Sequence, residues 1–84
     1  MKEKYIGKVI HFFPKVQVAA IELEGKLKVG DKVKFKKGEK EHEEIITSMQ
    51  IEHKDVKEAG KGEKVGVKVS EKIKEGFEVY KIIE

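Results

Sequence analysis

The sequence predicts an all-β protein, a small six-stranded antiparallel β-barrel that forms a single domain over residues 1–84. Two observations support this prediction. Turns that contain glycine recur along the chain, and a stretch of alternating polar and apolar residues follows each of them, as Gly30-Asp31 precedes residues 32–35. Such alternation places the apolar side chains on one face of a strand. Six strands joined by short turns favour a barrel, because closing the sheet leaves no unprotected edge.

The predicted strands span, in chain order, residues 5–13, 16–23, 32–36, 44–54, 64–69 and 77–83. In the first of them Tyr5, Gly7 and Val9 share one face. We expect this face to be interior, because Lys8 on the other face must contact water. A glycine inside a strand also indicates a bend, a bulge or the close approach of another backbone. Pro14 lacks a backbone donor and therefore marks the turn that follows.

The charged residues 37–43 are expected to form a mobile loop. In the longest predicted strand, the row that faces the core is expected to be Ile45, Thr47, Met49 and Ile51. Further along, Val56 and Ala59 are expected to pack back over the core. In the strand at 64–69 the valines face inward, and Gly66 falls on the outer row, where another group can approach the backbone closely.

The composition limits the classes of function. All 19 basic residues are lysines, and the 16 acidic residues nearly cancel them, so the formal net charge is only +3. A chain that is 42% charged and rich in Lys and Glu is typical of hyperthermophiles, and equally of very soluble mesophilic proteins. The absence of cysteine excludes disulfides and thiolate metal sites. No apolar run has the ~20 residues that a membrane helix needs, so we expect a cytoplasmic protein that does not contact membranes.

Several short motifs occur in a fixed order along nearly the whole chain: Ile6-Gly7-Lys8-Val9, Leu27-Lys28-Val29-Gly30-Asp31, Ser48-Met49-Gln50-Ile51, Gly62-Glu63-Lys64-Val65-Gly66-Val67 and Gly76-Phe77-Glu78-Val79-Tyr80. In this order they resemble the β-barrel of translation GTPases, the second domain of elongation factor Tu and its relatives. They resemble more closely the stand-alone translation elongation factor-like proteins. A similar barrel also occurs at the C-terminus of some U32-type peptidases.

The resemblance implies a non-enzymatic module that binds tRNA or ribosomal RNA, since this barrel helps to hold the acceptor end of tRNA, or contacts ribosomal RNA, in translation factors. The chain lacks the phosphate-binding loop of a GTPase, so neither a nucleotide nor another cofactor is expected. Elongation factors often carry Asp-Asn where Glu63-Lys64 stands here, so an amide contact from that position is not implied. Only one wall of the acceptor-end pocket is implied, because full-length factors form that pocket between domains.

Lysines are the predicted RNA-binding residues. Lys32, Lys34 and Lys36 alternate along one strand and point the same way, and Lys64 and Lys68 join them if their strand lies on the same side. Rows of cations bind phosphates and release counterions. The alternative is a solvated face that keeps the sheet soluble and protects its edges.

A second predicted surface consists of Ile10, Phe12 and Phe13, which lie beside the first turn. These side chains either cover the end of the barrel or form an exposed patch that contacts a protein. The alternative function is therefore a protein–protein interaction module that docks on a translation or RNA-processing partner.

We expect no catalytic residues and no metal site. His11 and His53 would approach each other if the first and fourth predicted strands paired, but their spacing matches no metal-binding motif. Ser48 lies on an outer row and not at a strained turn, which favours a solvated serine over a nucleophile. The carboxylates around Glu43 and Glu44 have no apolar surroundings in the sequence that would raise their pKa, so a solvated face is expected.

Overall fold

Ten β-strands and their connections make up residues 2–83, the part of the chain that the structure, a computed structural model, describes. The strands are β1 (Lys2–Phe13), β2 (Val18–Leu23), β3 (Leu27–Lys28), β4 (Lys32–Lys37), β5 (Lys40–Ile45), β6 (Met49–Ile51), β7 (Lys54–Val56), β8 (Glu58–Ala59), β9 (Lys64–Lys68) and β10 (Glu78–Ile83). The all-β prediction is therefore confirmed. Within residues 2–83 there is no helix of the length and apolarity that crossing a membrane requires.

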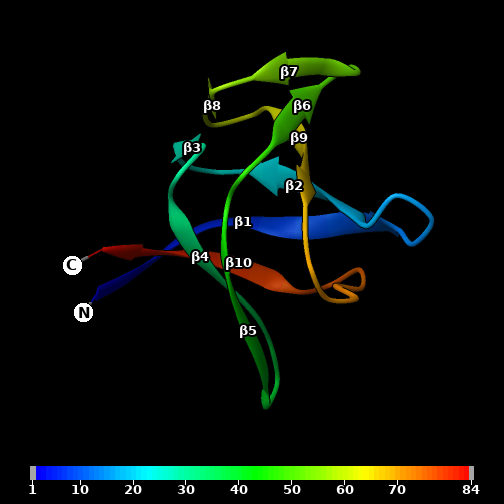
Figure 1. The fold of residues 1–84 in the computed structure, drawn as a ribbon. Helices are drawn as coiled ribbons and strands as arrows, with labels where there is room; N and C mark the ends of the chain where they lie inside the picture. The colour runs from blue at the N-terminus through cyan, green and yellow to red at the C-terminus, as the bar shows by residue number, and fades with distance from the viewer. Residues whose placement is uncertain (1, 84) are drawn as a thin grey trace.

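Eight strands form one antiparallel sheet in the order β5-β4-β10-β1-β2-β9-β6-β7. β5 and β6 are consecutive pieces of one extended segment, residues 40–51, yet they lie near opposite ends of this order. The sheet therefore curls round until this segment bonds to β4 on one side and to β9 on the other (Figure 1). Between the two strands, the Ile46 N–H donates to the Asp31 carbonyl at 2.9 Å, and the Ser48 carbonyl accepts from the Lys68 N–H at 3.4 Å. Counted as one strand, the segment completes the six-stranded barrel that the sequence predicts.

A separate two-stranded sheet, β3 with β8, lies at the end of the molecule that also carries β7 (Figure 1). In this pair Leu27 lies opposite Ala59, and both side chains are buried. Val56 is half-buried and packs against the core. The predicted packing of Val56 and Ala59 over the core is thus confirmed.

The interior of the barrel contains the valines of β9 and the predicted face of β1. Gly7 and Val9 are buried, as expected, but Tyr5 is 38% exposed and Ile6 is buried in its place. The cause is a bulge between Tyr5 and Gly7, which shifts the register of β1 against β10. A bulge changes which residues of a strand face inward, and the sequence alternation alone does not show it.

Residues 37–43 do not form the predicted mobile loop. They belong to the β4–β5 hairpin, which turns at Gly38. Opposite charges face each other across its strands: Lys32 Nζ lies 3.2 Å from a Glu43 carboxylate oxygen, and Lys36 Nζ lies 3.8 Å from Glu41. Cross-strand pairs of opposite charge stabilise a hairpin, so the absence of apolar residues from residues 37–43 did not indicate a loop.

The predicted strand at 44–54 consists of the end of β5, then β6, and the first residue of β7. Residues 46–48 are not strand, and the alternation shifts across them: Ile46 is buried while Ile45 is 57% exposed. Ile45 and Thr47 therefore do not face the core as predicted, whereas Met49 does. A tight turn then separates β6 from β7, with Glu52 at φ 50° and His53 at φ 67°. Glycine or asparagine usually marks such a turn, and here neither does.

Candidate nucleic-acid interface

An open groove of about 430 Å³ crosses three neighbouring strands, β2, β9 and β6. Its floor follows a register row in which Ala20 lies opposite Gly66, and Gly66 lies opposite Gln50. A Cβ atom added at Gly66 would approach Val18 Cγ1 to 3.0 Å, so a side chain at this position would crowd the floor. Gly66 thus lies on the outer row, as predicted, and keeps the groove open.

Apolar side chains form one rim of the groove. Phe13, at the end of β1, is 46% exposed, and Val16, in the turn that follows, is 58% exposed. The His11 ring meets the Phe13 ring edge-on, with centroids 4.4 Å apart. This contact positions the phenyl ring while leaving much of it open to solvent. An exposed ring of this kind offers a surface on which a planar group can stack.

Polar side chains form the other rim. Gln50 Nε2 donates to Asp55 Oδ1 at 3.0 Å, which fixes the amide at the edge of the groove. His53 projects from the β6–β7 turn, and Lys64 is exposed at the start of β9. No carboxylate in residues 2–83 forms an ion pair with Lys64. Glu52, in the same turn as His53, adds a carboxylate to the lining. The groove therefore combines an aromatic ring, an amide, an imidazole, a carboxylate and a cation that forms no ion pair within residues 2–83.

The predicted lysines on β4 are largely neutralised. Lys34 bonds to Glu3 and lies 3.7 Å from Glu41, and only 15% of its side chain is exposed. The hydrogen bond between Lys34 and Glu3 lowers the pKa of Glu3 and raises the pKa of Lys34, as expected for an ion pair. Lys32 and Lys36 pair with the carboxylates of β5 described above. The lysines of β4 therefore lie among carboxylates and do not form a cationic row.

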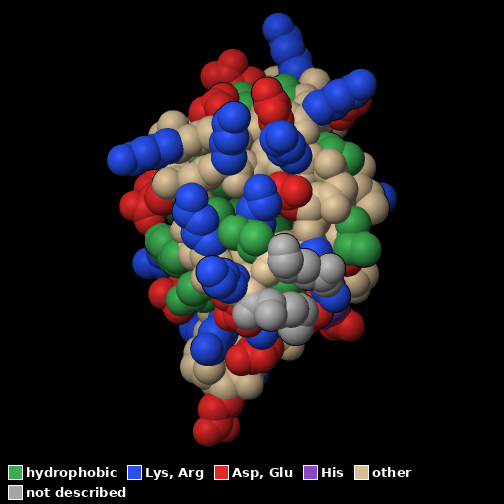
Figure 2. Space-filling model, turned by 90° about the vertical axis from the view of Figure 1, so that its left-hand side faces the viewer, with side chains coloured by type: hydrophobic (Ala, Val, Ile, Leu, Met, Phe, Trp, Pro, Cys, Tyr) green, Lys and Arg blue, Asp and Glu red, His purple; other side chains and the backbone are tan. Residues whose placement is uncertain are grey.

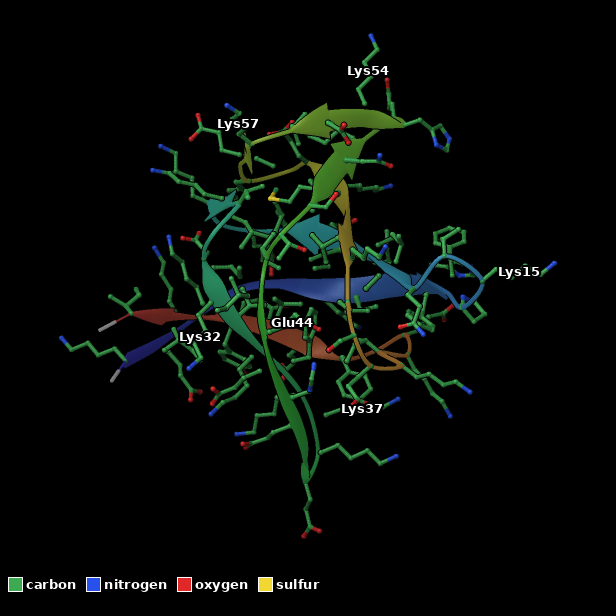
Figure 3. The ribbon with its side chains drawn as sticks, in the orientation of Figure 1. Lys15, Lys32, Lys37, Glu44, Lys54 and Lys57 are labelled. Atoms are coloured by element: carbon green, nitrogen blue, oxygen red, sulfur yellow. The ribbon has the colours of Figure 1, made fainter. Side chains whose placement is uncertain are left out.

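The structure does not bring the five predicted lysines into one row. Lys64 and Lys68 are exposed on β9, and the sheet order separates β9 from β4 by β10, β1 and β2 on one side and by segment 40–51 on the other. Figure 2 shows that lysines also cover the face beside β3 and β8, with carboxylates between them. Figure 3 places Lys54 and Lys57 at one end of the barrel and Lys37 near the other. Positive charge is therefore spread over the molecule, and RNA binding by the five lysines stays a prediction.

The predicted protein-contact residues lie at three different hollows. Phe13 borders the groove, Ile10 borders a second hollow together with Glu22, and Phe12 borders a third together with Pro14. Ile10 is 39% exposed, whereas Phe12 is half-buried and packs against the core. A bulge between Val9 and His11 contributes to this divergence. Phe12 therefore covers the core, whereas Ile10 and Phe13 are exposed but border different hollows, and protein contact by these residues stays a prediction.

A cluster of His42, Glu44 and Ser70 superficially resembles a catalytic set. Glu44 Oε1 accepts hydrogen bonds from the Ser70 backbone N–H at 2.7 Å, from the Ser70 hydroxyl at 3.0 Å and from His42 Nε2 at 3.1 Å. The serine hydroxyl is bonded to the carboxylate and not to the imidazole, and the hydrogen bonds that lower the pKa of Glu44 make this carboxylate a weak base. His11 bonds to Glu75 at 3.2 Å, and residues 2–83 contain no group of three metal-ligating side chains. The cluster ties β5 to the loop after β9.

Sequence reasoning missed Gln50, His53 and Val16 as groove residues. Two signals pointed to the groove: Gln50 lies within the Ser48-Met49-Gln50-Ile51 motif, and Gly66 lies on the outer row. The missing information was that β6 neighbours β9, which brings these residues together.

Comparison with known proteins identifies the family of this barrel. A family model described as "Elongation factor Tu domain 2" matches residues 18–79. The chain belongs to this family. Two crystal structures of the C-terminal domain of a Geobacillus thermoleovorans protein assigned to the U32 peptidases share its fold. One of them, a selenomethionine variant, has a TM-score of 0.85 and the other 0.87, both at 19% identity. They cover 90% and 95% of this chain, and 96% and 93% of their own.

A curated relative corrects the expectation of a non-enzymatic protein. An uncharacterized protease of Methanocaldococcus jannaschii is 50% identical over 76 residues, which are 89% of this chain. The name of this relative points to a protease family, so that expectation is wrong. The elongation factor Tu domain 2 barrel described here spans about a fifth (19%) of the length of the archaeal relative.

Proposed function

We propose that this chain serves as the barrel module of a U32-type protease and that its groove binds an unpaired base of RNA. The protease part of the proposal is supported by the 50% identity with the archaeal relative and by the fold shared with the peptidase C-terminal domain. The RNA part is supported by one observation above the others: the exposed Phe13 ring stands beside a groove whose floor is a glycine.

The chemistry of the groove suits a base and its phosphate. A base would stack on Phe13, where the ring is open to solvent. The Gln50 amide and the His53 imidazole supply hydrogen-bonding groups that the edge of a base requires. Lys64, without an ion-pair partner in residues 2–83, is available for the phosphate.

Fluorescence anisotropy tests the RNA part of the proposal, with a labelled tRNA and the same tRNA trimmed of its single-stranded 3′ end. We expect the intact tRNA to bind more tightly, and Phe13→Ala to weaken its binding by about fivefold or more through lost stacking. Lys57→Glu, which does not line the groove, is the control for a general loss of positive charge. Equal affinity for the two RNAs, or equal losses in the two variants, would contradict the proposal.

The lysines are expected to contribute unequally to this affinity. Lys64→Ala and Lys68→Ala should each weaken binding and reduce its salt dependence, because these lysines have no carboxylate partners in the described chain. Lys32→Ala and Lys36→Ala should have smaller effects, since Glu43 and Glu41 already neutralise these side chains. Titration of the four variants at two salt concentrations checks this order, and a larger effect on β4 would reverse it.

The protease part is tested on the archaeal relative. Its cleavage of a peptide library is measured with and without the segment that matches this chain. We expect removal of the segment to lower cleavage, and addition of this chain as a separate protein to restore part of it. Unchanged cleavage without the segment would contradict a role of the barrel in the protease.

The exposure of Phe13 and Val16 also favours a second candidate function, docking on a protein partner. A partner that is retained on the immobilised chain after nuclease treatment, and that is lost with Phe13→Ala, would favour this function over RNA binding.

A further inference from the structure

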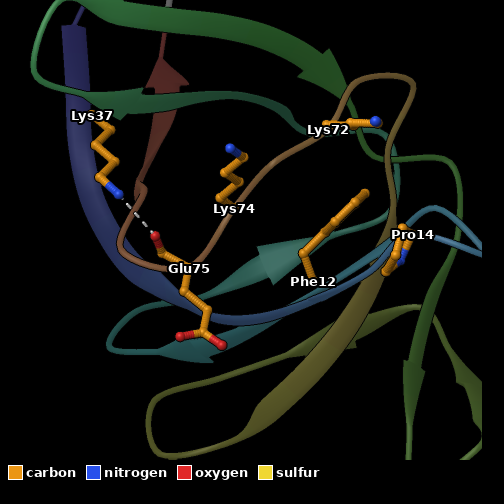
Figure 4. A pocket seen from close by; sticks show the side chains of 6 residues that line it. All are labelled: Phe12, Pro14, Lys37, Lys72, Lys74 and Glu75. Atoms are coloured by element: carbon orange, nitrogen blue, oxygen red, sulfur yellow. Dashed lines mark hydrogen bonds between the residues drawn. The ribbon is translucent and has the colours of Figure 1, made fainter.

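The hollow beside Phe12 and Pro14, of about 480 Å³, is also lined by Lys37, Lys72, Lys74 and Glu75 (Figure 4). It shares no lining residue with the groove. We propose that this hollow binds a phosphate group whose carrier has a planar or apolar body. The proposal does not depend on the RNA-binding function of the groove.

The side chains of three lysines line this hollow. Lys37 Nζ donates to the Glu75 carbonyl at 3.2 Å and lies 5.9 Å from the centre of the Phe77 ring, so its position is fixed. Lys72 and Lys74 come from the loop between β9 and β10. Within residues 2–83, none of the three lysines forms an ion pair with a carboxylate. Their mutual repulsion is relieved when an anion binds between them.

The carboxylate of Glu75 does not neutralise these lysines. Its Oε1 lies 3.2 Å from Nδ1 of His11, on the other side of the loop backbone. Figure 4 shows this carboxylate turned away from Lys37, Lys72 and Lys74, while the backbone carbonyl of Glu75 faces Lys37. Among residues 2–83, Glu75 is the one acidic residue that lines the hollow, and its carboxylate is therefore directed elsewhere.

The wall opposite the lysines decides the class of ligand. Phe12 is half-buried and packs against the core, and with Pro14 it presents a firm apolar surface. Lysine binds phosphate as a point charge, and three separate ammonium groups suit a tetrahedral dianion better than a flat carboxylate with two oxygens. The apolar wall suits the body that carries the phosphate. The 5′ end of an RNA and a small phosphorylated aromatic molecule share this chemistry.

Residue-resolved NMR titration of the ¹⁵N-labelled chain tests the proposal, with phenyl phosphate as the probe and phenol as its uncharged counterpart. We expect phenyl phosphate to shift the amide signals of residues 72–76 in a saturable way, phenol to leave them in place, and inorganic phosphate to compete. The double variant Lys72→Glu/Lys74→Glu should weaken binding about tenfold or more, because two charge-assisted contacts are lost. Both lysines are exposed, so the variant should fold.

The matched control is Lys54→Glu/Lys57→Glu, which makes the same change of charge near the other end of the barrel (Figure 3). Affinity for phenyl phosphate should stay within about twofold of the unaltered chain in this control. Equal losses in the two double variants, equal shifts with phenol, or unsaturated shifts at millimolar probe would overturn the proposal.

A short RNA with and without a 5′ phosphate then distinguishes the two carriers of the phosphate. Shifts at residues 72–76 only with the phosphorylated RNA indicate an RNA end. If neither RNA shifts these signals, the carrier is a small molecule. The groove contributes to neither readout, because its residues have separate signals.

Discussion

At the scale of single residues, Gly7 shows how closely two strands of this barrel approach each other. A Cβ atom added there would lie 2.6 Å from the carbonyl oxygen of Glu22 and 3.0 Å from Cγ2 of Ile21. The first of these atoms belongs to the backbone and cannot rotate away. The sequence predicted a bend, a bulge or a close approach at this glycine, and the structure has both the bulge and the close approach. A glycine inside an apolar alternation was sufficient to locate this feature.

We predict that Gly7→Ala lowers the free energy of unfolding by about 1–3 kcal/mol, because β1 must move away from β2 to admit the methyl group. Gly60→Ala is the control, since a Cβ at that position would meet only Glu63 Oε1, at 4.0 Å. Its free energy of unfolding should stay within about 0.5 kcal/mol of the unaltered chain. Urea unfolding of the two variants gives both values. Similar losses of unfolding free energy in Gly7→Ala and Gly60→Ala would show that the strands admit the methyl group beside the Glu22 carbonyl without strain.

At the scale of elements, the sequence located strands whose inner faces are apolar and missed the strand held by charges. The valines of β9 and the turn at Gly30-Asp31 follow the expected pattern, and both were predicted. β5 has no such pattern: Glu41 and Glu43 lie opposite lysines of β4, and Glu44 bonds to a distant loop. Charge pairs between strands depend on which strands are neighbours, and alternation within one strand does not contain that information.

Within residues 2–83, Glu44 is the one carboxylate that joins β5 to the loop after β9 by hydrogen bonds. Burial alone would raise the pKa of its carboxyl, but the hydrogen bonds from Ser70 and His42 outweigh burial and hold the pKa below its ordinary value of 4.5. A carboxyl with a lowered pKa in the folded state stabilises the fold above its unfolded pKa, and this contribution is lost as the pH falls through the lowered value.

We predict that Glu44→Gln lowers the free energy of unfolding by about 1–2 kcal/mol near neutral pH, because the charge-assisted hydrogen bonds become neutral ones. The difference from the unaltered chain should shrink as the pH falls below 4.5. Urea unfolding of both proteins across this range measures it. Glu39→Gln, at the exposed turn of the β4–β5 hairpin, serves as the control and should show a small, pH-independent difference. If the unfolding free-energy difference between Glu44→Gln and the unaltered chain did not change with pH, the charge of Glu44 would not contribute to its interaction with Ser70 and His42.

At the scale of the whole molecule, the barrel depends on the two seams where segment 40–51 meets β4 and β9. These seams also decide the candidate site: they place β6 beside β9, which assembles the groove, and keep β9 apart from β4, which divides the predicted lysines. The sequence identified Phe13 and Lys64 separately, for protein contact and for RNA contact, and the fold places them at one groove. Neighbour relations between distant strands arise from closure of the sheet, so alternation along the chain could not supply them.

Ile45 and Ile46 provide a direct test of this closure, because they are adjacent in sequence and opposite in environment. Ile46 is fully buried, its N–H donates to the Asp31 carbonyl at 2.9 Å, and its own carbonyl accepts from the Gly30 N–H at 2.7 Å. Ile45, which the alternation of the sequence assigned to the core, is 57% exposed.

We predict that Ile46→Ala costs about 2–5 kcal/mol of unfolding free energy through the lost contacts and the cavity left at the seam. Ile45→Ala, the same chemical change one residue away, should cost no more than about 0.5 kcal/mol. Urea unfolding of the two variants measures both costs. A larger loss for Ile45→Ala would mean that Ile45 faces the core, as the alternation predicted, and would contradict the strand contacts on which the groove depends. A larger loss for Ile46→Ala would place the closure of the barrel at Ile46.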